Sequence, residues 1–382
     1  MHFSWNKRVL ASSFAVLSVM ATSLNAIPKG PCDKVKEEIC CEAPKPGPFA
    51  FAYPMDLGLN CPRDFYVHVD GLAFQAKQDG MDFAIEDTSG TAGTPTAPIT
   101  YGKMIGFSSD NSDWDWNPGM RFGFGFYLDH DAWNIDFNWT WLNITDYKHG
   151  NASTNGSVLI PLWTLGSANT AGAPSLFGTT ASAVWKTHYN TIDLSIGKPY
   201  YVSRYFILDP NFGLRGGWID QHFSVDYGGF GDARTIHHGD NKFWGVGLRA
   251  GMNSEWIVGK GWCLFANVSA CMMASKFEVH QNMVAPTGTT SVSPEGPDGF
   301  DTDYDFYQNV PNMEMAIGIA WSKYFDRNKY RINLKAAYEF IEWWDQFNMR
   351  RFFSGNPGYA NDVVSRGNLT LNGFSLKAQI DI

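Results

Sequence analysis

The stretch Met120–Asp129 reads MRFGFGFYLD, and Trp133–Trp141 reads WNIDFNWTW. In both stretches every second residue is large and apolar, and most residues between them are glycine, polar or charged. Neighbouring side chains of a β-strand point to opposite faces. Each stretch therefore predicts a strand with one apolar face and one polar face.

The same period of two recurs from residue 64 to the last residue. It predicts further strands within 206–218, 244–253, 262–272, 312–322, 330–340 and 374–382, and weaker ones over 64–77 and 183–198. The patterns run to about 15 residues, whereas strands of globular proteins usually have about 5–6. Strands of this length argue against a soluble β-sandwich, which would otherwise show the same alternation.

The connections between these strands alternate between short and long. Short turns are expected at 129–131, 198–203, 259–261 and 326–328, and long polar segments at 78–112, 148–182, 220–241, 280–310 and 346–367. This alternation is typical of bacterial outer-membrane barrels, which have tight periplasmic turns and long external loops. The count gives about ten strands, and weak patterns at 81–86 and 101–107 would raise it to 12 or 14.

We therefore expect an all-β fold, a closed antiparallel transmembrane β-barrel of about 10–12 strands. Closure gives every backbone N–H and C=O group in the hydrocarbon an internal partner. Aromatic residues near the ends of the apolar faces fit the two interfacial girdles of such a barrel. They are Trp133, Trp218, Trp244, Trp262, Trp321, Tyr330 and Tyr338.

The first residues have the layout of a secretory signal peptide. Lys7 and Arg8 precede the apolar stretch Val9–Met20, and a cleavage region ends at Ala26. The apolar stretch is too short to span a bilayer as a helix. An ordinary N-terminal helix is the alternative. We expect residues 1–26 to direct export to the bacterial outer membrane, followed by an extension over 27–63 and a barrel over 64–382.

Cysteines are concentrated in the extension, which also contains seven prolines and is expected to be irregular and periplasmic. Cys40 and Cys41 are adjacent and would bridge one another only with strain. Two interpretations of the extension stay open. Some of its cysteines form disulfides to other envelope proteins, or they form a local disulfide of the Cys32–Cys61 kind or remain free thiols. The candidates are Cys32, Cys40, Cys41 and Cys61. Downstream, Cys263 and Cys271 share one strand face about 27 Å apart, too far to bridge.

Residues on the polar strand faces are expected to line the barrel interior. Repeated glycines on these faces indicate that space or curvature is needed there. Charges of both signs would hold water and set an ion preference around a small opening. Alternatively, they pair across a plugged interior. The candidate pore-lining residues are Arg121, Asp136, Asp193, Arg215, Arg249, Glu314, Arg331, Lys335 and Glu339.

Three segments carry a family resemblance: 65–76 (FYVHVDGLAFQA) with DGMD at 79–82, 116–123 (WNPGMRFG) and 213–217 (GLRGG). They resemble the major-outer-membrane-protein-like porins of Legionella and of environmental chlamydiae, over most of the mature chain. The resemblance implies a pore-forming outer-membrane protein, often abundant and sometimes cross-linked by disulfides. The chain departs from the pattern at Ile382, where many such barrels end in an aromatic residue.

The function predicted is that of a porin for ions and small solutes, without a cofactor. Expected partners are outer-membrane lipid, further copies of the chain and disulfide-linked envelope proteins. A formal net charge of −9 disfavours nucleic acid as a partner. The alternatives are a structural or adhesive barrel with a closed lumen, and an outer-membrane protease or lipase. For an enzyme, His149, His188 or His222 would be the base, beside Asp146 or Asp220, but no catalytic motif is recognisable.

Two segments have residues that bind metals in other proteins. His237 and His238 are adjacent in a predicted external loop, but no third ligand has a convincing spacing. Four aspartates fall within Asp298–Asp305, without the full ligand order of a calcium loop. Both segments are interpreted as solvated loops, so no metal site is expected.

Overall fold

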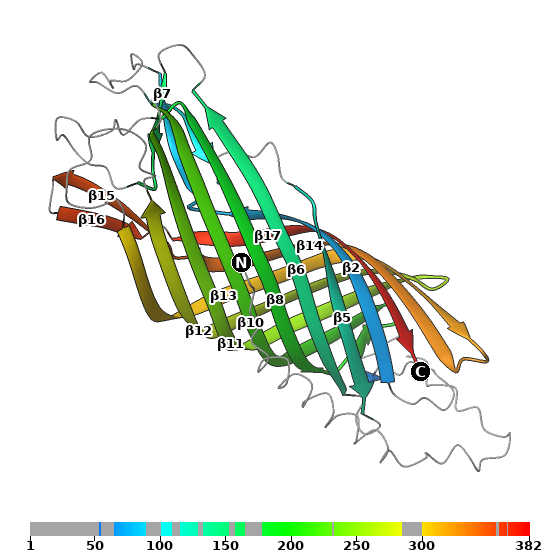
Figure 1. Ribbon diagram of the computed structural model, residues 1–382. Helices are drawn as coiled ribbons and strands as arrows, with labels where there is room; N and C mark the ends of the chain where they lie inside the picture. Colours follow the sequence, from blue (N-terminus) through cyan, green and yellow to red (C-terminus); the bar gives the residue numbers. More distant parts are fainter. Residues whose placement is uncertain are drawn as a thin grey trace, which may run out of the picture. The chain divides into compact units, whose positions relative to one another are not determined.

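The computed structural model (Figure 1) describes residues 53–54, 65–88, 101–108, 115–128, 133–152, 157–164, 178–230, 233–284, 300–356, 359–364 and 366–382. The predicted signal peptide, nearly all of the predicted extension and its four cysteines lie outside these residues. Within the described ranges, no helix is long and apolar enough to cross a membrane.

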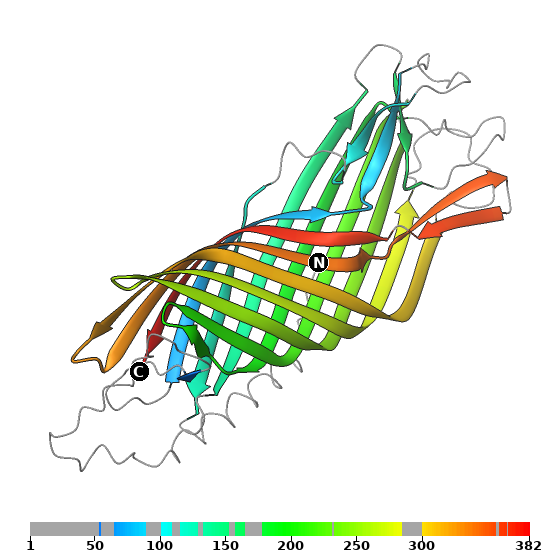
Figure 2. The same ribbon diagram turned by 180° about the vertical axis from the view of Figure 1, so that it is seen from behind.

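Ten long strands form a closed antiparallel barrel (Figures 1 and 2). Each strand pairs with the next one along the chain, and the last pairs with the first to close the ring. The predicted fold class is thus confirmed. The barrel strands are β2 (Phe65–Gln78), β5 (Asn117–Tyr127), β6 (Asn134–Asn151), β8 (Thr180–Gly197), β10 (Phe206–Phe230), β11 (Ala233–Gly259), β12 (Trp262–Val284), β13 (Phe300–Phe325), β14 (Tyr330–Phe347) and β17 (Gly367–Asp381).

Seven shorter strands lie outside this ring. A three-stranded sheet contains β3 (Asp82–Asp87), β4 (Tyr101–Gly106) and β7 (Val158–Pro161). Strands β15 (Arg350–Asn356) and β16 (Tyr359–Val364) form a hairpin, and β9 (Tyr200–Ser203) and β1 (Tyr53–Pro54) extend the pairing at the start of β10. The option that 81–86 and 101–107 add a barrel hairpin is wrong. Strands of six residues fall short of the roughly 9–11 that a tilted membrane strand needs.

The short connections between β8 and β10, between β11 and β12 and between β13 and β14 lie at the same end of the barrel as Ile382. The predicted turn at 198–203 contains β9, and the one at 129–131 lies outside the described residues. The turn between β11 and β12 uses left-handed backbone at Lys260 (φ 53°) and Gly261 (φ 82°), which a tight reversal requires. At the same end the N–H group of Ile382 donates to the carbonyl of Phe65 at 2.9 Å. Because tight turns of such barrels face the periplasm, we call this end periplasmic and the opposite end external.

The barrel strands continue beyond the lengths expected from the sequence. Strands β10 and β11 pair without interruption as far as Tyr227 and Thr235, so most of the segment 220–241 is strand and not loop. Strands β12 and β13 likewise pair as far as Met283 and Phe300. The expectation of external loops is therefore wrong over most of 220–241 and at 280–284 and 300–310, while 285–299 lies outside the described residues. In these extensions most outward side chains are polar, whereas the inward face of the membrane-spanning part is the polar one. The inward side chains of the extensions are mainly apolar, with a few buried polar ones such as Gln221, His237 and Gln281.

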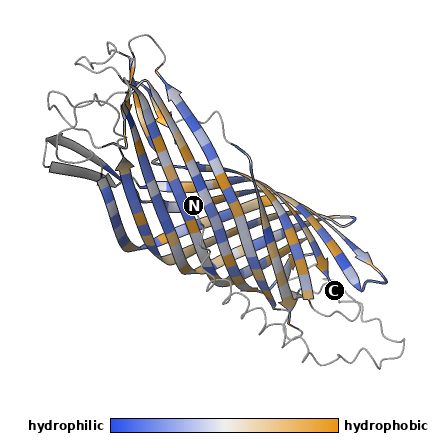
Figure 3. Cartoon of the chain, viewed as in Figure 1, coloured by the Kyte–Doolittle hydropathy of each residue, from blue (hydrophilic) through white to orange (hydrophobic). Residues whose placement is uncertain are grey.

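Hydrophilic and hydrophobic residues alternate along the barrel strands (Figure 3). The outward-facing residues form an apolar band between two aromatic girdles. Trp139 and Leu248 face outward, with exposed fractions of 42% and 74%. Trp218 pairs with Trp244 at the external edge of the band, and Trp262 pairs with Trp321 at the periplasmic edge. The twelve residue steps from Trp244 to Trp256 on β11 span about 40 Å of strand, or about 28 Å across the membrane at a tilt of ~45°. This height matches the hydrocarbon layer.

Candidate functional site

The interior of the barrel contains a polar cavity of about 290 Å³ toward its periplasmic end. Inward-facing residues of all ten barrel strands line it, among them seven carboxylates and five lysine or arginine side chains. Several buried polar atoms of this lining have no hydrogen-bond partner among the described residues, including His68 Nε2, Asp209 Oδ1 and Arg249 Nε. Such atoms need water or a polar solute, so the cavity is a hydrated space inside the membrane-spanning part.

Arg121 connects two separated walls of the cavity. Its guanidinium donates to Glu339 on β14, with nitrogen–oxygen distances of 3.2 and 2.9 Å, and to Asp70 on β2 at 3.2 Å. Asp70 is in turn 2.9 Å from His68 Nδ1 on the same strand face. Strands β5 and β14 are not neighbours in the ring, so this ion pair crosses the lumen.

Arg215 makes a second crossing, and it is only 1% exposed. Its guanidinium holds Asp193 on the neighbouring strand β8 through two bonds of 2.6 and 2.7 Å. It also reaches β13, where Nη2 lies 2.8 Å from Glu314 and Nη1 donates to Asn312 at 2.8 Å. Two carboxylates and an amide thus surround one buried cation, which offsets much of the cost of burying the charges.

A third layer of ion pairs lies near the periplasmic rim. Lys335 on β14 donates to Glu255 on β11 at 2.6 Å, again across the lumen. Arg331 donates to Asp381 on the adjacent strand β17 at 2.7 Å. Lys377, by contrast, has no ion pair among the described residues. The lumen is therefore crossed by charged bridges and is not an open tube.

The external half of the interior is filled by an apolar cluster, which we call the external plug. Its barrel part consists of inward-facing aromatic and aliphatic side chains, and its other part comes from the segments between barrel strands. The barrel members include Trp185, Tyr189, Phe223, Phe243, Phe277 and Trp343, and the segment members include Met81, Phe83, Phe107, Trp163 and Met349. Nearly all of these side chains are fully buried, so the plug closes the lumen on the external side.

Hydrogen bonds to backbone carbonyls hold the segments of the external plug in place. Trp163 Nε1 donates to the carbonyl of Asp82 at 2.9 Å, and the Tyr227 hydroxyl donates to that of Phe83 at 2.6 Å. Arg351 donates to the carbonyls of Gly80 and Asp82 at 2.7 and 3.0 Å, and its guanidinium lies 4.9 Å from the Trp163 ring centre. The segments are thus bound to the strands and to each other.

A family model described as Legionella pneumophila major outer membrane protein precursor matches residues 60–382. The chain belongs to this family. It is therefore an outer-membrane β-barrel protein, and the family resemblance noted from the sequence is confirmed. A comparison with curated protein sequences finds no match.

Several solved structures are similar to this outer-membrane protein. The outer membrane protease OmpT from Escherichia coli is 11% identical, covers 84% of this chain and 96% of its own, and has a TM-score of 0.34. A Pseudomonas aeruginosa FadL homologue is 8% identical, with 83% and 89% covered and a TM-score of 0.21. The Pseudomonas putida toluene transporter TodX is 5% identical, with 84% and 89% covered and a TM-score of 0.21. Similarities this low carry no argument about function.

All nine pore-lining candidates of this outer-membrane protein lie on inward-facing strand positions. Eight of them line the cavity, and Arg215 lies behind the lining in contact with Glu314. Their role in conduction stays a prediction. The structure adds lining residues that the sequence analysis did not single out: Tyr66, His68, Asp70, Asp209, Glu255 and Lys377. Asp70 shares a face with His68 in the weak alternating pattern at 64–77. That alternation is the sequence signal from which Asp70 could have been predicted to face the lumen.

The inward glycines include two that lie directly against large side chains of neighbouring strands. A side chain at Gly123 would collide with His68 and Asn138, and one at Gly125 would collide with the ring of Tyr66. Both glycines therefore make room for large side chains of neighbouring strands. At these two positions space is indeed needed on the inward face, and side chains of neighbouring strands occupy it.

The two metal-binding suggestions from the sequence fall on strands instead of loops. His237 points inward, is fully buried and lies against the rings of Trp163 and Phe223, so its interpretation as a solvated loop residue is wrong. His238 points outward on the same strand, 2.9 Å from the hydroxyl of Ser224. In the aspartate-rich segment, Asp301, Asp303 and Asp305 lie on β13, and Asp298 lies outside the described residues.

The candidate bases for an enzyme do not converge on the lumen. His188 is hydrogen-bonded to Asn143 at 2.6 Å, and His222 to Asp240 at 2.6 Å, both on the outward face. Asp146 instead lies on the inward face of β6. The arrangement therefore gives no support to a catalytic triad built from these residues.

Proposed function

We propose that this outer-membrane barrel is a porin, through which ions and small polar solutes pass by way of the charged cavity. The observation that carries the proposal is the cavity itself, a hydrated space inside the membrane-spanning part that is lined by charged side chains. A barrel with only a structural role has no need for unpartnered polar atoms and an unpaired lysine in its interior. Conduction requires that the external plug moves aside, because its side chains close the lumen.

The charges of the lining favour cations. The cavity has seven carboxylates and five lysine or arginine side chains, an excess of two negative charges. An excess of carboxylates around a narrow passage attracts cations and repels anions. The proposed pore is therefore weakly selective for cations.

Conductance across a planar bilayer tests the proposal. The purified protein is expected to give discrete current steps, with a reversal potential in a salt gradient that indicates cation preference. Asp209→Asn removes one lining carboxylate, which accepts a bond from Asn253 at 2.9 Å and belongs to no ion pair with a described residue, so it should reduce that preference. Asp326→Asn, in a periplasmic turn, is the matched control and should leave the preference unchanged.

A sealed barrel with a structural role is the second candidate. The external plug favours it, because buried side chains held by hydrogen bonds fill the external half of the lumen. Bilayers that contain correctly folded protein but show no current steps would establish this candidate and refute the pore.

The proposal keeps two features that rest on the sequence alone. Residues 1–26 are removed on export, and some of Cys32, Cys40, Cys41 and Cys61 link the barrel to other envelope proteins. N-terminal sequencing of the protein from membranes should begin at Ile27. Gels without reductant should show a ladder that collapses when reductant is added, and a single band would rule out cross-linking.

A further inference from the structure

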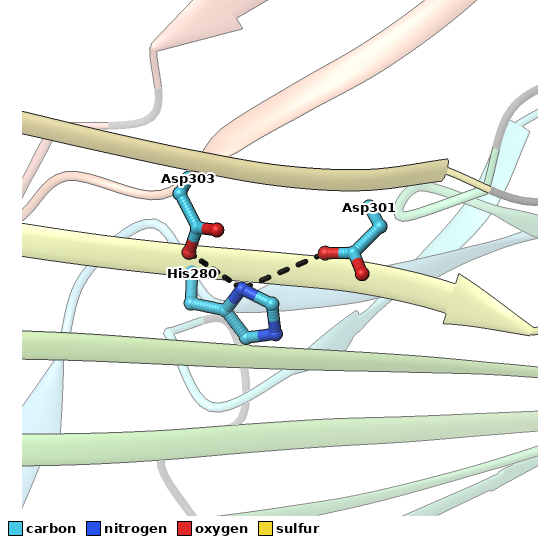
Figure 4. A group of neighbouring side chains, drawn as sticks. All are labelled: His280, Asp301 and Asp303. Carbon is cyan, nitrogen blue, oxygen red and sulfur yellow. Dashed lines mark hydrogen bonds and ion pairs between the residues drawn. The ribbon is translucent and has the colours of Figure 1, made fainter.

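Three side chains meet on the outward face of the barrel, on the external side of the aromatic girdle (Figure 4). His280 lies on β12, and Asp301 and Asp303 lie on β13. His280 Nδ1 is 2.7 Å from Asp303 Oδ1 and 3.6 Å from Asp301 Oδ1. One nitrogen and two carboxylate oxygens thus converge on one point, with all three atoms within 4.8 Å of one another.

The register of the strands produces this meeting. His280 is directly opposite Asp303, and Asp301 is two residues further along β13 on the same face. The same level continues across two more strands, where Asp240 is opposite His280 and His222 is opposite Asp240. The three side chains are therefore held by backbone pairing on strands of the barrel and not by a loop.

The charges at this point are not balanced. Lys276, the nearest lysine along β12, instead binds Glu278 at 2.8 Å and Asp305 at 3.1 Å. In the described part of the chain, no lysine or arginine forms an ion pair with Asp301 or Asp303. The imidazole Nδ1 has one proton or one lone pair and cannot satisfy two carboxylates at once. The three side chains therefore form a site that has more negative than positive charge and one nitrogen that can bind a metal ion.

An independent observation points to the same place. The amide oxygen of Asn282 is buried and has no hydrogen-bond partner among the described residues. Asn282 is directly opposite Asp301 and shares the outward face of β12 with His280. A buried acceptor without a donor is rare, and a cation or a water bound to a cation would satisfy it.

We propose that His280, Asp301 and Asp303 bind a divalent transition-metal ion of the zinc class. One imidazole and two carboxylates suit such ions better than calcium, which takes six to eight oxygen ligands. Donor atoms around tetrahedral zinc are about 3.3 Å apart, so Asp301 needs little movement and Asp303 moves back by about 0.6 Å. The carboxylates are largely exposed, which gives them this freedom and gives the ion access from outside.

Three protein ligands leave a fourth position for Asn282, water or an external anion. The site faces away from the lumen, so the metal proposal does not depend on whether the barrel conducts ions. Its ligands come from two strands that are about twenty residues apart in the sequence. The sequence therefore shows no recognisable metal-ligand spacing.

The test uses the full-length protein, purified in detergent and treated with a chelator. Titration with Co²⁺ should give the visible absorption of a four-coordinate site at one ion per chain, and Zn²⁺ should displace it. His280→Asn and Asp303→Asn should each weaken Zn²⁺ binding at least tenfold, and Asn282→Ala should weaken it less. His188→Asn, outward-facing on β8 and outside the cluster, is the matched control and should bind as the native protein does.

Heat-modifiable migration on gels verifies that each variant is a folded barrel, so that weaker binding is not unfolding. The proposal is overturned if the native protein binds no Co²⁺ or Zn²⁺ at one ion per chain. It is also overturned if His280→Asn binds as tightly as the native protein, or if His188→Asn loses as much. Binding of Ca²⁺ without binding of Co²⁺ or Zn²⁺ would refute the proposal that the ion is a transition metal of the zinc class.

Discussion

Charged residues inside the barrel act as cross-braces between its walls. Arg215 is the most enclosed of them, because Asp193, Glu314 and Asn312 surround its guanidinium. A buried ion pair adds little stability by comparison with a well-packed apolar pair. Removing only one partner of the pair is costly, because the other charge then stays buried where water cannot fully replace the lost partner.

Replacing Arg215 with Met should therefore destabilise the barrel strongly. Asp193 and Glu314 would be left without their cation, at a cost of about 3–5 kcal/mol. Urea unfolding in lipid vesicles, followed by tryptophan fluorescence, measures this loss. The control is Arg234→Ala, which breaks an exposed pair with Asp226 and should leave the unfolding midpoint unchanged. Equal midpoints for both variants would contradict the bracing role.

His237 makes the external plug sensitive to acid. It lies outside the membrane-spanning band, and burial lowers its pKa to about 3, with a smaller contribution from His238. An opened plug would return the pKa to about 6.5, so the opened state binds the proton between these two values. The stability of the plug is complete above pH 6.5 and falls by at most about 1.4 kcal/mol per pH unit as the pH drops toward 3.

Hydrogen exchange of plug amides between pH 7 and pH 4.5, corrected for the intrinsic rate, measures this effect. Protection should fall in the native protein as the pH drops. In His237→Phe it should fall much less, because the phenyl ring fills similar volume and carries no proton. The same fall in both proteins would assign the acid sensitivity to other groups.

Each long strand passes through two environments, and β11 shows this most clearly. Between Trp256 and Trp244 its outward residues, apart from Ser254, are apolar and face lipid. Beyond Trp244 its outward residues Lys242 and Asp240 are charged. The inward residues change in the opposite sense, from Arg249 to the buried Phe243. One strand therefore contributes both to a membrane barrel with a wet interior and to an external extension with an apolar core.

The position of the membrane band can be tested on this single strand. Leu248→Arg places a charge near the middle of the band and should destabilise the barrel by about 2–4 kcal/mol in lipid. Asp240→Arg lies on the same face beyond the girdle and should cost much less. If the two substitutions had the same effect on unfolding in vesicles, the assigned band would be wrong.

The segments of the external plug are the elements most able to control conduction. In the described part of the chain they contact the barrel through side chains and a few hydrogen bonds, and Trp163 packs its ring against Phe223 on β10 and Phe347 on β14. Trp163→Ala leaves a cavity at a cost of about 3–5 kcal/mol and removes the bond to Asp82. Because the barrel strands keep all their backbone bonds, the loss should open the plug and not the barrel.

We therefore expect Trp163→Ala to raise the bilayer conductance or the fraction of time in the conducting state. Trp139→Ala, which removes a lipid-facing tryptophan, is the control and should leave conductance as it is. A Trp163→Ala barrel that folds but conducts no more than the native protein would show that the plug does not limit the current.

At the scale of the whole molecule, the ring is closed by the pairing of β17 with β2, the last and first barrel strands. Closure removes the free sheet edges and allows the cross-lumen ion pairs to join strands that are distant in sequence. Arg121 and Glu339, for example, are 218 positions apart. The ion pair between Arg121 on β5 and Glu339 on β14 therefore depends on the completed ring.

The alternating pattern, the short turns and the aromatic girdles determined the barrel, its approximate strand number and the face that meets lipid. These features are local, because a strand's two faces follow from the parity of its own residues. The same parity placed all nine candidate residues on the inside.

Only the tertiary structure decided how far the strands extend, what fills the lumen and which side chains meet. Beyond the girdles lipid is absent, so polar residues face outward, and a stretch such as 220–241 resembles a loop although it is paired strand. The plug, the braces and the group of His280, Asp301 and Asp303 all join residues of different strands. Their contacts depend on register and ring closure, which are relations between segments that no single segment contains.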